Sequence, residues 1–424
     1  MLRGVPTSAL LILILSLAVG SLLLLALWRA GPSSTPDLSD VRVVILYERV
    51  TDGGQINRSL DDVAEIVEET GADMVFRGFW VWGPILRDCS QLPERYRESC
   101  ELSGRSYSSL EEAISRLKEA RPLIFCGAVP AQKVFRRIEY DPRTGRVFRY
   151  PETWEMALDP GKWGIPVSKE EFQCEFGRTH LWVERELNCS DYDPREASAY
   201  FPDITDERFQ GLLLGWALEQ VDRGADAIWI DMLLAQARMM GRLTGDPEHP
   251  AVRDALDAAR GIVQEIKRYG ESLGRRVYVG SWWTAAIFPD PPELDFVTMS
   301  PAPREVRSME LDEARWEERI RLVRERLGDV PIIVMIDWAA TSDTPLGVFS
   351  QELSPEQQRE FLRRLDEFCR ERGLLLAYPV HGGWMGKDAV RLSFGRFRFY
   401  DSLAPEFQTY ETIVELATAR RVGG

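Results

Sequence analysis

Histidine is scarce in this sequence, and its scarcity narrows the chemistry available to the protein. The chain has only 3 histidines, His180, His249 and His381, and it contains neither an HxH pair nor a CxxC pair. Metal-dependent barrel hydrolases and structural zinc sites draw their ligands from such pairs, so we expect no metal and no cofactor. A GxSxG elbow, a P-loop and a dinucleotide-binding glycine fingerprint are also missing from suitable contexts. The sequence therefore argues against serine-hydrolase, nucleotide-dependent and zinc-dependent classes.

Basic residues are fewer than acidic residues in this sequence. The chain carries 52 lysines and arginines against 67 aspartates and glutamates, a formal net charge of -15. A nucleic-acid partner requires basic surface to neutralise phosphates. We therefore expect no nucleic-acid partner.

Cysteines are few, and their spacing is informative. Four of the 6 form two local pairs that bracket short polar loops: Cys89 with Cys100, and Cys174 with Cys189. If each pair is bridged, the disulfide contributes ~3 kcal/mol in the chain-entropy model. Cys126 and Cys369 lie in apolar contexts and are predicted to be buried free thiols. Disulfides would indicate an oxidising compartment outside the cytoplasm.

The sequence has one long hydrophobic run, residues 8–28, which is uncharged throughout. At 1.5 Å per residue it is long enough to cross a bilayer core of ~30 Å. We predict that residues 1–30 are a retained membrane anchor, with an uncleaved or cleaved signal peptide as the alternative. Residues 31–40 are then a linker, and residues 41–424 form the folded domain. The paired cysteines and the glycosylation sequons at Asn57 and Asn188 favour a single-pass protein at the cell membrane with its large domain extracellular.

Beyond residue 40, apolar strand-like segments alternate with helical patterns. Eight such segments occur: 41–48, 72–80, 122–130, 224–232, 276–283, 294–301, 331–338 and 374–383. Helices are expected between them, including one capped by Ser108, one over 310–327 and a last one near 404–417. The helix after the fifth strand is missing or very short. This alternation predicts an α/β fold, a (β/α)8 TIM barrel, with residues 132–205 as a long insertion between strands three and four.

In such a barrel the C-terminal ends of all strands meet at one mouth, so the residues found there are interpreted together. Four carboxylates are candidate catalytic groups: Asp231, Asp337, Glu48, and Glu305 in the loop after strand six. The other candidates bind substrate: Arg77, Trp80, Trp282, Trp283, Trp338, His381 and Trp384. Tryptophan rings stack on sugar faces, and paired carboxylates perform glycosidic cleavage. Each candidate also has a structural alternative: core packing for each tryptophan, helix capping for Asp231, and a salt bridge inside the barrel for Arg77. Asp226 and Asp295 are expected to fix strand starts.

The segment IWIDM at 228–232 resembles the strand-four nucleophile motif of family 31 α-glycosidases and, more loosely, of other retaining TIM-barrel glycoside hydrolases. The preceding GADA is similar to the Gly-x-Asp-Gly entry to that strand. The match ends after Met232, where Leu233 and Leu234 replace Asn-Glu, which indicates an uncharacterised glycosidase-like family. The resemblance implies that Asp231 is the nucleophile.

A second carboxyl group is needed, and Asp337 is the first choice because IDW repeats the ending of strand four. Glu48 is the second choice. Glu305 is the third, and it is the one that the resemblance favours, because family 31 draws its acid from the sixth strand.

The sequence thus predicts a membrane-anchored extracellular glycoside hydrolase acting on a carbohydrate substrate. Asp231 is expected to be nucleophile or base, with Asp337 as its acid partner. The alternative is a catalytically inactive barrel that binds surface glycans or scaffolds an envelope assembly.

Overall fold

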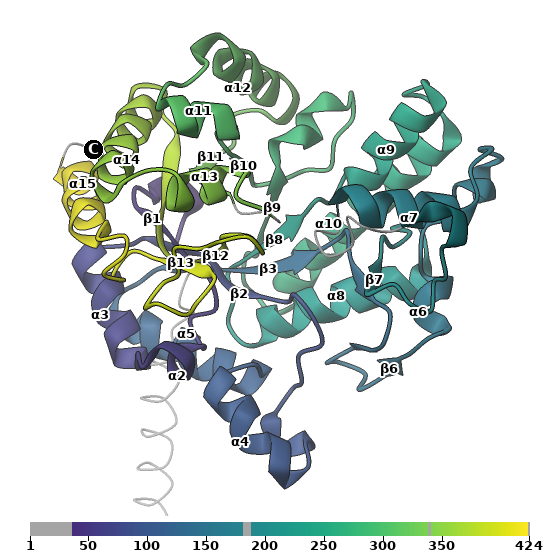
Figure 1. The fold of residues 1–424 in the computed structure, drawn as a ribbon, viewed down its shortest axis with the longest axis horizontal. Helices are drawn as coiled ribbons and strands as arrows, with labels where there is room; N and C mark the ends of the chain where they lie inside the picture. Colours follow the sequence, from purple (N-terminus) through teal and green to yellow (C-terminus); the bar gives the residue numbers. More distant parts are fainter. Residues whose placement is uncertain (1–35, 181–187, 338–340, 423–424) are drawn as a thin grey trace, which may run out of the picture. The chain divides into compact units, whose positions relative to one another are not determined.

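A computed structural model describes residues 36–180, 188–337 and 341–422 of the chain. Eight parallel strands form a sheet that closes on itself, because the first strand pairs with both the second and the last. A short strand, β13, pairs antiparallel with β12, the last of the eight (Figure 1). The strands are β1 (Val44–Tyr47), β2 (Met74–Trp80), β3 (Ile124–Pro130), β8 (Ala227–Asp231), β9 (Tyr278–Trp282), β10 (Phe296–Met299), β11 (Ile332–Met335), β12 (Leu375–Trp384) and β13 (Phe399–Asp401). The predicted (β/α)8 barrel is confirmed.

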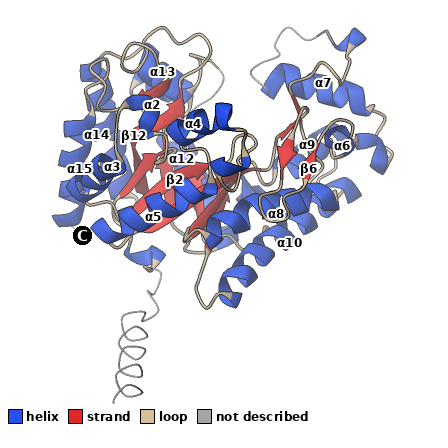
Figure 2. Ribbon diagram, turned by 90° about the horizontal axis from the view of Figure 1, so that it is seen from below, coloured by secondary structure: helices blue, strands red, loops and turns tan. Residues whose placement is uncertain are grey.

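Helices surround the strands, as the blue and red ribbons of Figure 2 show. The longer ones are α3 (Leu60–Thr70), α4 (Glu94–Ser103), α5 (Tyr107–Ala120), α8 (Glu207–Asp222), α9 (Ala235–Thr244), α10 (Pro250–Ser272), α12 (Glu313–Leu327), α14 (Pro355–Glu371) and α15 (Tyr410–Val422). The shorter ones are α2 (Gly53–Ile56), α11 (Pro303–Ser308), α13 (Pro345–Gln351) and the 3-10 helices η1 (Leu38–Asp40), η2 (Cys89–Gln91) and η5 (Trp283–Ile287). After the fifth barrel strand there is only η5, as expected.

Three helix starts differ from the sequence predictions. Ser106, not Ser108, caps α5, because its side chain accepts the N–H of Ser109. α12 begins at Glu313 behind the cap residue Asp312, and the separate helix α11 precedes it. The last helix begins only at Tyr410, because Gln408 has a φ of +54°, which a right-handed helix cannot contain.

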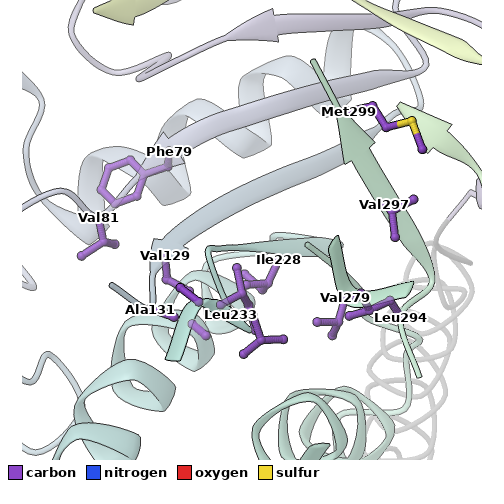
Figure 3. Packing of buried hydrophobic residues seen from close by; sticks show 14 of the residues in the cluster. Phe79, Val81, Val129, Ala131, Ile228, Leu233, Val279, Leu294, Val297 and Met299 are labelled. Atoms are coloured by element: carbon purple, nitrogen blue, oxygen red, sulfur yellow. The ribbon is translucent and has the colours of Figure 1, made fainter. Parts of the chain in front are cut away.

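Alternation along the strands produces two apolar layers. In β8, Ala227 and Trp229 face the barrel interior, whereas Ile228 and Ile230 face the helices. The outer layer is the larger, and Figure 3 shows Ile228, Val279 and Val297 in it. Because successive side chains of a strand point to opposite faces, this two-residue period also decides where the polar strand ends point.

Aspartates fix the N-terminal ends of the strands. Asp226 accepts the backbone N–H of Phe125 at 2.9 Å, and its carboxylate lies 2.7 Å from Lys118 Nζ. Asp295 accepts the N–H of Val279 at 2.8 Å. The prediction that Asp226 and Asp295 fix strand starts is confirmed.

The segment between β3 and α8 is the predicted insertion. It contains β4 (Val134–Phe135), β5 (Glu139–Tyr140), β6 (Val147–Phe148), α6 (Glu152–Glu155), η3 (Pro160–Trp163), α7 (Lys169–His180), η4 (Cys189–Asp191) and β7 (Ala199–Tyr200). β5 and β6 pair as an antiparallel hairpin. Arg143 in its turn pairs with Asp222 of α8, and Trp163 donates its indole N–H to Asp254 of α10 at 2.8 Å. The insertion is therefore attached to α8, which precedes β8, and to α10, which follows α9.

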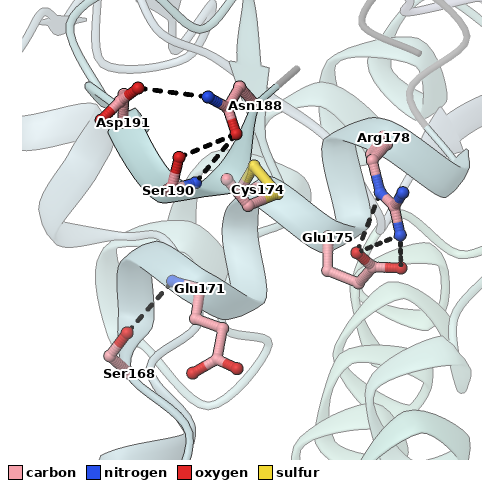
Figure 4. The surroundings of a disulfide bond; sticks show 9 residues. Ser168, Glu171, Cys174, Glu175, Arg178, Asn188, Ser190 and Asp191 are labelled. Carbon is pink, nitrogen blue, oxygen red and sulfur yellow. Dashed lines mark hydrogen bonds and ion pairs between the residues drawn. A yellow bond between two sulfur atoms is a disulfide. The ribbon is translucent and has the colours of Figure 1, made fainter. Parts of the chain in front are cut away.

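Both predicted disulfides are present, Cys89 with Cys100 and Cys174 with Cys189. Beside the second one, the side chain of Asn188 accepts the N–H of Ser190 and caps η4 (Figure 4). Cys126 and Cys369 are buried free thiols, as predicted.

The predicted membrane span at 8–28 lies outside the described residues. Within residues 36–180, 188–337 and 341–422, none of the helices is both long and apolar enough to cross a bilayer.

Replacing Cys174 and Cys189 together with serine is expected to lower the free energy of unfolding by ~3 kcal/mol, because the open chain regains loop entropy. Urea denaturation of wild type and variant measures the difference. The Cys89→Ser, Cys100→Ser pair opens the other, similarly short loop, so it should cost a similar amount. Equal stability of all three proteins would contradict the expectation.

Candidate active site at the C-terminal end of the barrel

Three carboxylates continue the inward-facing rows of their strands. Val44 and Leu46 of β1 fill the interior, and the next residue in that row is Glu48. In the same way Ala227 and Trp229 lead to Asp231 on β8, and Ile333 and Met335 lead to Asp337 after β11. The two-residue period thus directs all three toward the barrel axis.

Arg77 links two of these carboxylates, Glu48 and Asp337. It is fully buried, and its Nη2 pairs with Glu48 while its Nη1 lies 3.3 Å from Asp337. Its guanidinium also stacks on Trp80, 4.0 Å from the ring centre. We call Glu48, Asp231, Asp337 and Arg77 the carboxylate cluster.

A bulge in β2 is what brings Arg77 inward. Pairing with β3 shifts register between Val75 and Phe79, and Arg77 itself has a φ of +57°. A bulge adds a residue to one strand and re-aims the side chains around it. The interior salt bridge that was the alternative for Arg77 is therefore present, and its partners are two of the candidate catalytic carboxylates.

Asp231 is held by neutral donors. Trp282 Nε1 donates to Oδ1 at 2.7 Å, and Gln132 Nε2 donates to Oδ2 at 2.5 Å. Burial raises the pKa of Asp231 above its ordinary value, and it outweighs the lowering effect of these two donors and of the Arg77 charge. The negative charge of Glu48 adds to the increase.

Residues with a strained, positive-φ backbone lie beside the same carboxylates. Arg49, which follows Glu48, has a φ of +55°, and Met232, which follows Asp231, has a φ of +56°. With Arg77 they are three non-glycine residues in the left-handed region, a conformation that costs free energy and persists only where the surrounding structure imposes it. Such residues cluster at functional sites.

The predicted tryptophans divide into two groups. Trp80 and Trp282 face the interior, where they pack edge-on against Trp229, with ring centres 6.2 and 5.7 Å away. Trp283, one residue further on, faces outward and lies against Arg319 of α12. Trp283 is therefore not part of the inward-facing site, because the strand period turns it away.

The other two predicted tryptophans have different outcomes. Trp384 is half-buried at the end of β12, where it pairs with β13. Trp338 lies outside the described residues.

Glu305 has a structural role. It is buried in the first turn of α11, where it accepts the N–H groups of Ala302 and Asp312 and the indole N–H of Trp316. Trp316 packs against Phe368 of α14, so this carboxylate faces the helix layer. These contacts correct its assignment as a catalytic acid.

His381 is a buried ion-pair partner, which corrects its assignment to substrate binding. Its Nδ1 lies 2.6 Å from Asp401 and its Nε2 lies 3.2 Å from Asp52. The register between β1 and β12 shifts just before His381, which brings the ring against Tyr47. Burial alone would lower the pKa of His381, but the carboxylates of Asp52 and Asp401 outweigh it and raise the pKa to about 9.

Sequence reasoning missed Gln132, Lys133 and Trp82. Lys133 is buried, and its Nζ lies 4.6 Å from the ring centre of Trp82, which in turn packs edge-on against Trp80. The strand period in the sequence does predict that Gln132 points toward the barrel interior. Ile124, Cys126 and Ala128 form the inward row of β3, and the same period reaches residue 132.

Across the described part of the chain, no group of three or more histidine, cysteine, aspartate or glutamate side chains is arranged to hold a metal ion.

Comparison with known proteins gave structural likeness only. No protein-family model and no curated protein matched the sequence. Among solved structures, the glycoside hydrolase domain of PelA from Pseudomonas aeruginosa is 12% identical, with a TM-score of 0.38 over 82% of this chain and 96% of that one. The debranching enzyme of Nostoc punctiforme is 13% identical, with a TM-score of 0.47 over 92% and 81% of the two chains. A GH113 β-1,4-mannanase is 11% identical, with a TM-score of 0.45 over 89% and 99%.

The first of these structures is named as a glycoside hydrolase domain. At such identities and scores, however, the likeness concerns the fold and gives neither activity nor substrate.

The charge on His381 should make stability depend on pH. Its pKa is higher in the folded chain, so the contribution is fully present below about pH 6.5 and disappears as pH rises through about 9. Between these limits wild type should lose ~3 kcal/mol more than His381→Asn, which has no such charge. Urea denaturation of both proteins across this range tests the expectation, and parallel pH profiles would contradict it.

Proposed function

We propose that the protein is a glycoside hydrolase whose reaction is carried out by the carboxylate cluster. The observation that carries the proposal is the convergence of Glu48, Asp231 and Asp337 from three different strand ends around the buried Arg77. Catalytic groups of this fold come from such strand ends. The strained residues beside Glu48 and Asp231 support the same location.

The surroundings of the carboxylates favour a division of roles. Burial favours the protonated form of Asp231, which suits it to give a proton to the glycosidic oxygen as the bond breaks. Glu48 and Asp337 instead lie against the buried positive charge of Arg77. This order differs from the sequence prediction, in which Asp231 was nucleophile or base and Asp337 the acid.

Asp337 is the better candidate for the second catalytic carboxylate. Its side chain is 22% exposed, whereas that of Glu48 is 10% exposed, and the second oxygen of Glu48 accepts the N–H of Gly383 at 2.7 Å. In the proposed reaction the Asp337 carboxylate either attacks the anomeric carbon, forming a glycosyl ester that water then hydrolyses with Asp231 as base, or activates a water for direct attack. Glu48 then holds Arg77 in place. The anomeric configuration of the product distinguishes attack by Asp337 from attack by water.

The proposed substrate is a carbohydrate. The half-buried rings of Trp82, Trp282 and Trp384 lie at or near the ends of β2, β9 and β12. Indole faces bind the apolar faces of sugar rings. Trp80 and Trp229 lie deeper and support this aromatic surface.

Asp231→Asn is expected to reduce hydrolysis at least about a hundredfold, because the amide cannot transfer the proton. Turnover is measured on a panel of aryl glycosides and polysaccharides, and glycan binding by calorimetry should persist. The matched control is Asp226→Asn, which alters the other end of the same strand and should lower stability while leaving turnover unchanged. A wild-type protein that binds glycans but hydrolyses none of the panel would contradict the proposal and favour a binding module.

We further propose that residues 8–28 anchor the enzyme in the cell membrane, with the barrel outside. The two disulfides support an oxidising location, because such bonds are rare in the cytosol. The sequon residues Asn57 and Asn188 are both exposed, as glycan attachment would require.

The full chain is therefore expected to sediment with membranes and to resist a carbonate wash, whereas residues 36–424 alone should stay in solution. Mass measurement of the mature protein tests the alternative, because a cleaved signal peptide would remove the span. Protease added to intact cells should digest the barrel. Protection of the barrel would contradict the proposed orientation.

A further inference from the structure

The two oxygens of Asp231 meet donors of different kinds. Oδ1 accepts the indole N–H of Trp282, and an indole nitrogen can only donate. Oδ1 is therefore an acceptor in both protonation states of the carboxyl group. When Asp231 carries a proton, the proton belongs on Oδ2, which faces Gln132.

The side chain of Gln132 is an amide, which offers donors at one end and an acceptor at the other. In the orientation described, Nε2 donates to Asp231 Oδ2, and no other hydrogen bond holds this amide within the described residues. Its Oε1 is buried and has no hydrogen-bond partner there. Turning the amide over therefore breaks only the bond to Asp231.

The separation of the two side chains is within a few tenths of an ångström of what each arrangement requires. It is 2.5 Å, at the short end of the range for O–H···O bonds and below the usual range for N–H···O bonds. A protonated Oδ2 facing the amide oxygen would have this separation. An ionised Oδ2 facing Nε2 would need only a slight lengthening.

The backbone holds the pair together. Pro130 is in register with Asp231 on the neighbouring strand, and the N–H of Ala131 donates to the carbonyl of Asp231 at 2.9 Å. Gln132 follows directly, so its position relative to Asp231 is fixed by strand pairing. Rotation of the terminal amide then needs no backbone movement.

We propose that Gln132 is a positioning residue that serves both protonation states of Asp231, donating through Nε2 to the carboxylate and accepting through Oε1 from the carboxylic acid. The inference rests on the proposed function, in which Asp231 gives up and regains a proton in each turnover. Rotation of the Gln132 amide keeps Oδ2 of Asp231 hydrogen-bonded both when it carries the proton and when it has lost it. The charged groups that act on Asp231, Arg77 and Glu48, are the same in both states.

The proposal separates Gln132 from Trp282 in a measurable way. Trp282 stabilises the ionised form more, so Trp282→Phe should weaken the acid about tenfold. Gln132→Met removes a partner from both forms, so the acid dissociation constant of Asp231 should change less than about twofold. The C=O stretch of protonated Asp231 should rise in frequency in Gln132→Met, because its O–H loses an acceptor.

Infrared difference titration of the full chain measures these quantities, with Asp231→Asn identifying the band. Gln132→Leu is the second variant in case the methionine protein fails to fold. Equal tenfold effects of the Gln132 and Trp282 variants, or an unchanged C=O stretch, would overturn the proposal. The titration needs no substrate, so an enzyme inactive on every glycan would refute the proposed function and leave this result standing.

Discussion

The buried charge of Arg77 is the constraint on which the C-terminal end of the barrel depends. A guanidinium without exposure to solvent is costly unless carboxylates pair with it, and here they come from the ends of β1 and β11. Those two strands lie on either side of β12, where the sheet closes. The ion pairs thus join chain segments that are far apart in sequence.

The fold followed from sequence because its signal is repeated many times. Eight apolar segments at strand length, separated by helical periods, are consistent with one closed sheet. Helix starts were less accurate, since serine at either 106 or 108 is a suitable cap residue and the structure uses Ser106.

Part of the candidate site was predictable because three strands keep a regular two-residue period up to their C-terminal ends. Regular rows led correctly to the convergence of Glu48, Asp231 and Asp337. His381 follows a register shift, which no residue pattern announces, and its ring turned toward Asp52 and Asp401. Glu305 was misassigned because a glutamate near a strand end can cap a helix or face a substrate. Only its tertiary contacts, with the backbone of Asp312 and the indole of Trp316, decide between the two.

Because inward and outward side chains alternate, the residues that reach the barrel interior depend on the exact number of residues in each strand, much as codons depend on a reading frame. In β8 the frame gives Ala227, Trp229 and Asp231 to the interior, and Ile228 and Ile230 to the helices. Deleting one residue within the strand would exchange the two sets beyond that point. The Asp231 carboxylate would then point into the apolar layer between strands and helices, and an isoleucine would take its place in the barrel interior. A change of one residue in strand length would therefore be far more damaging here than most substitutions.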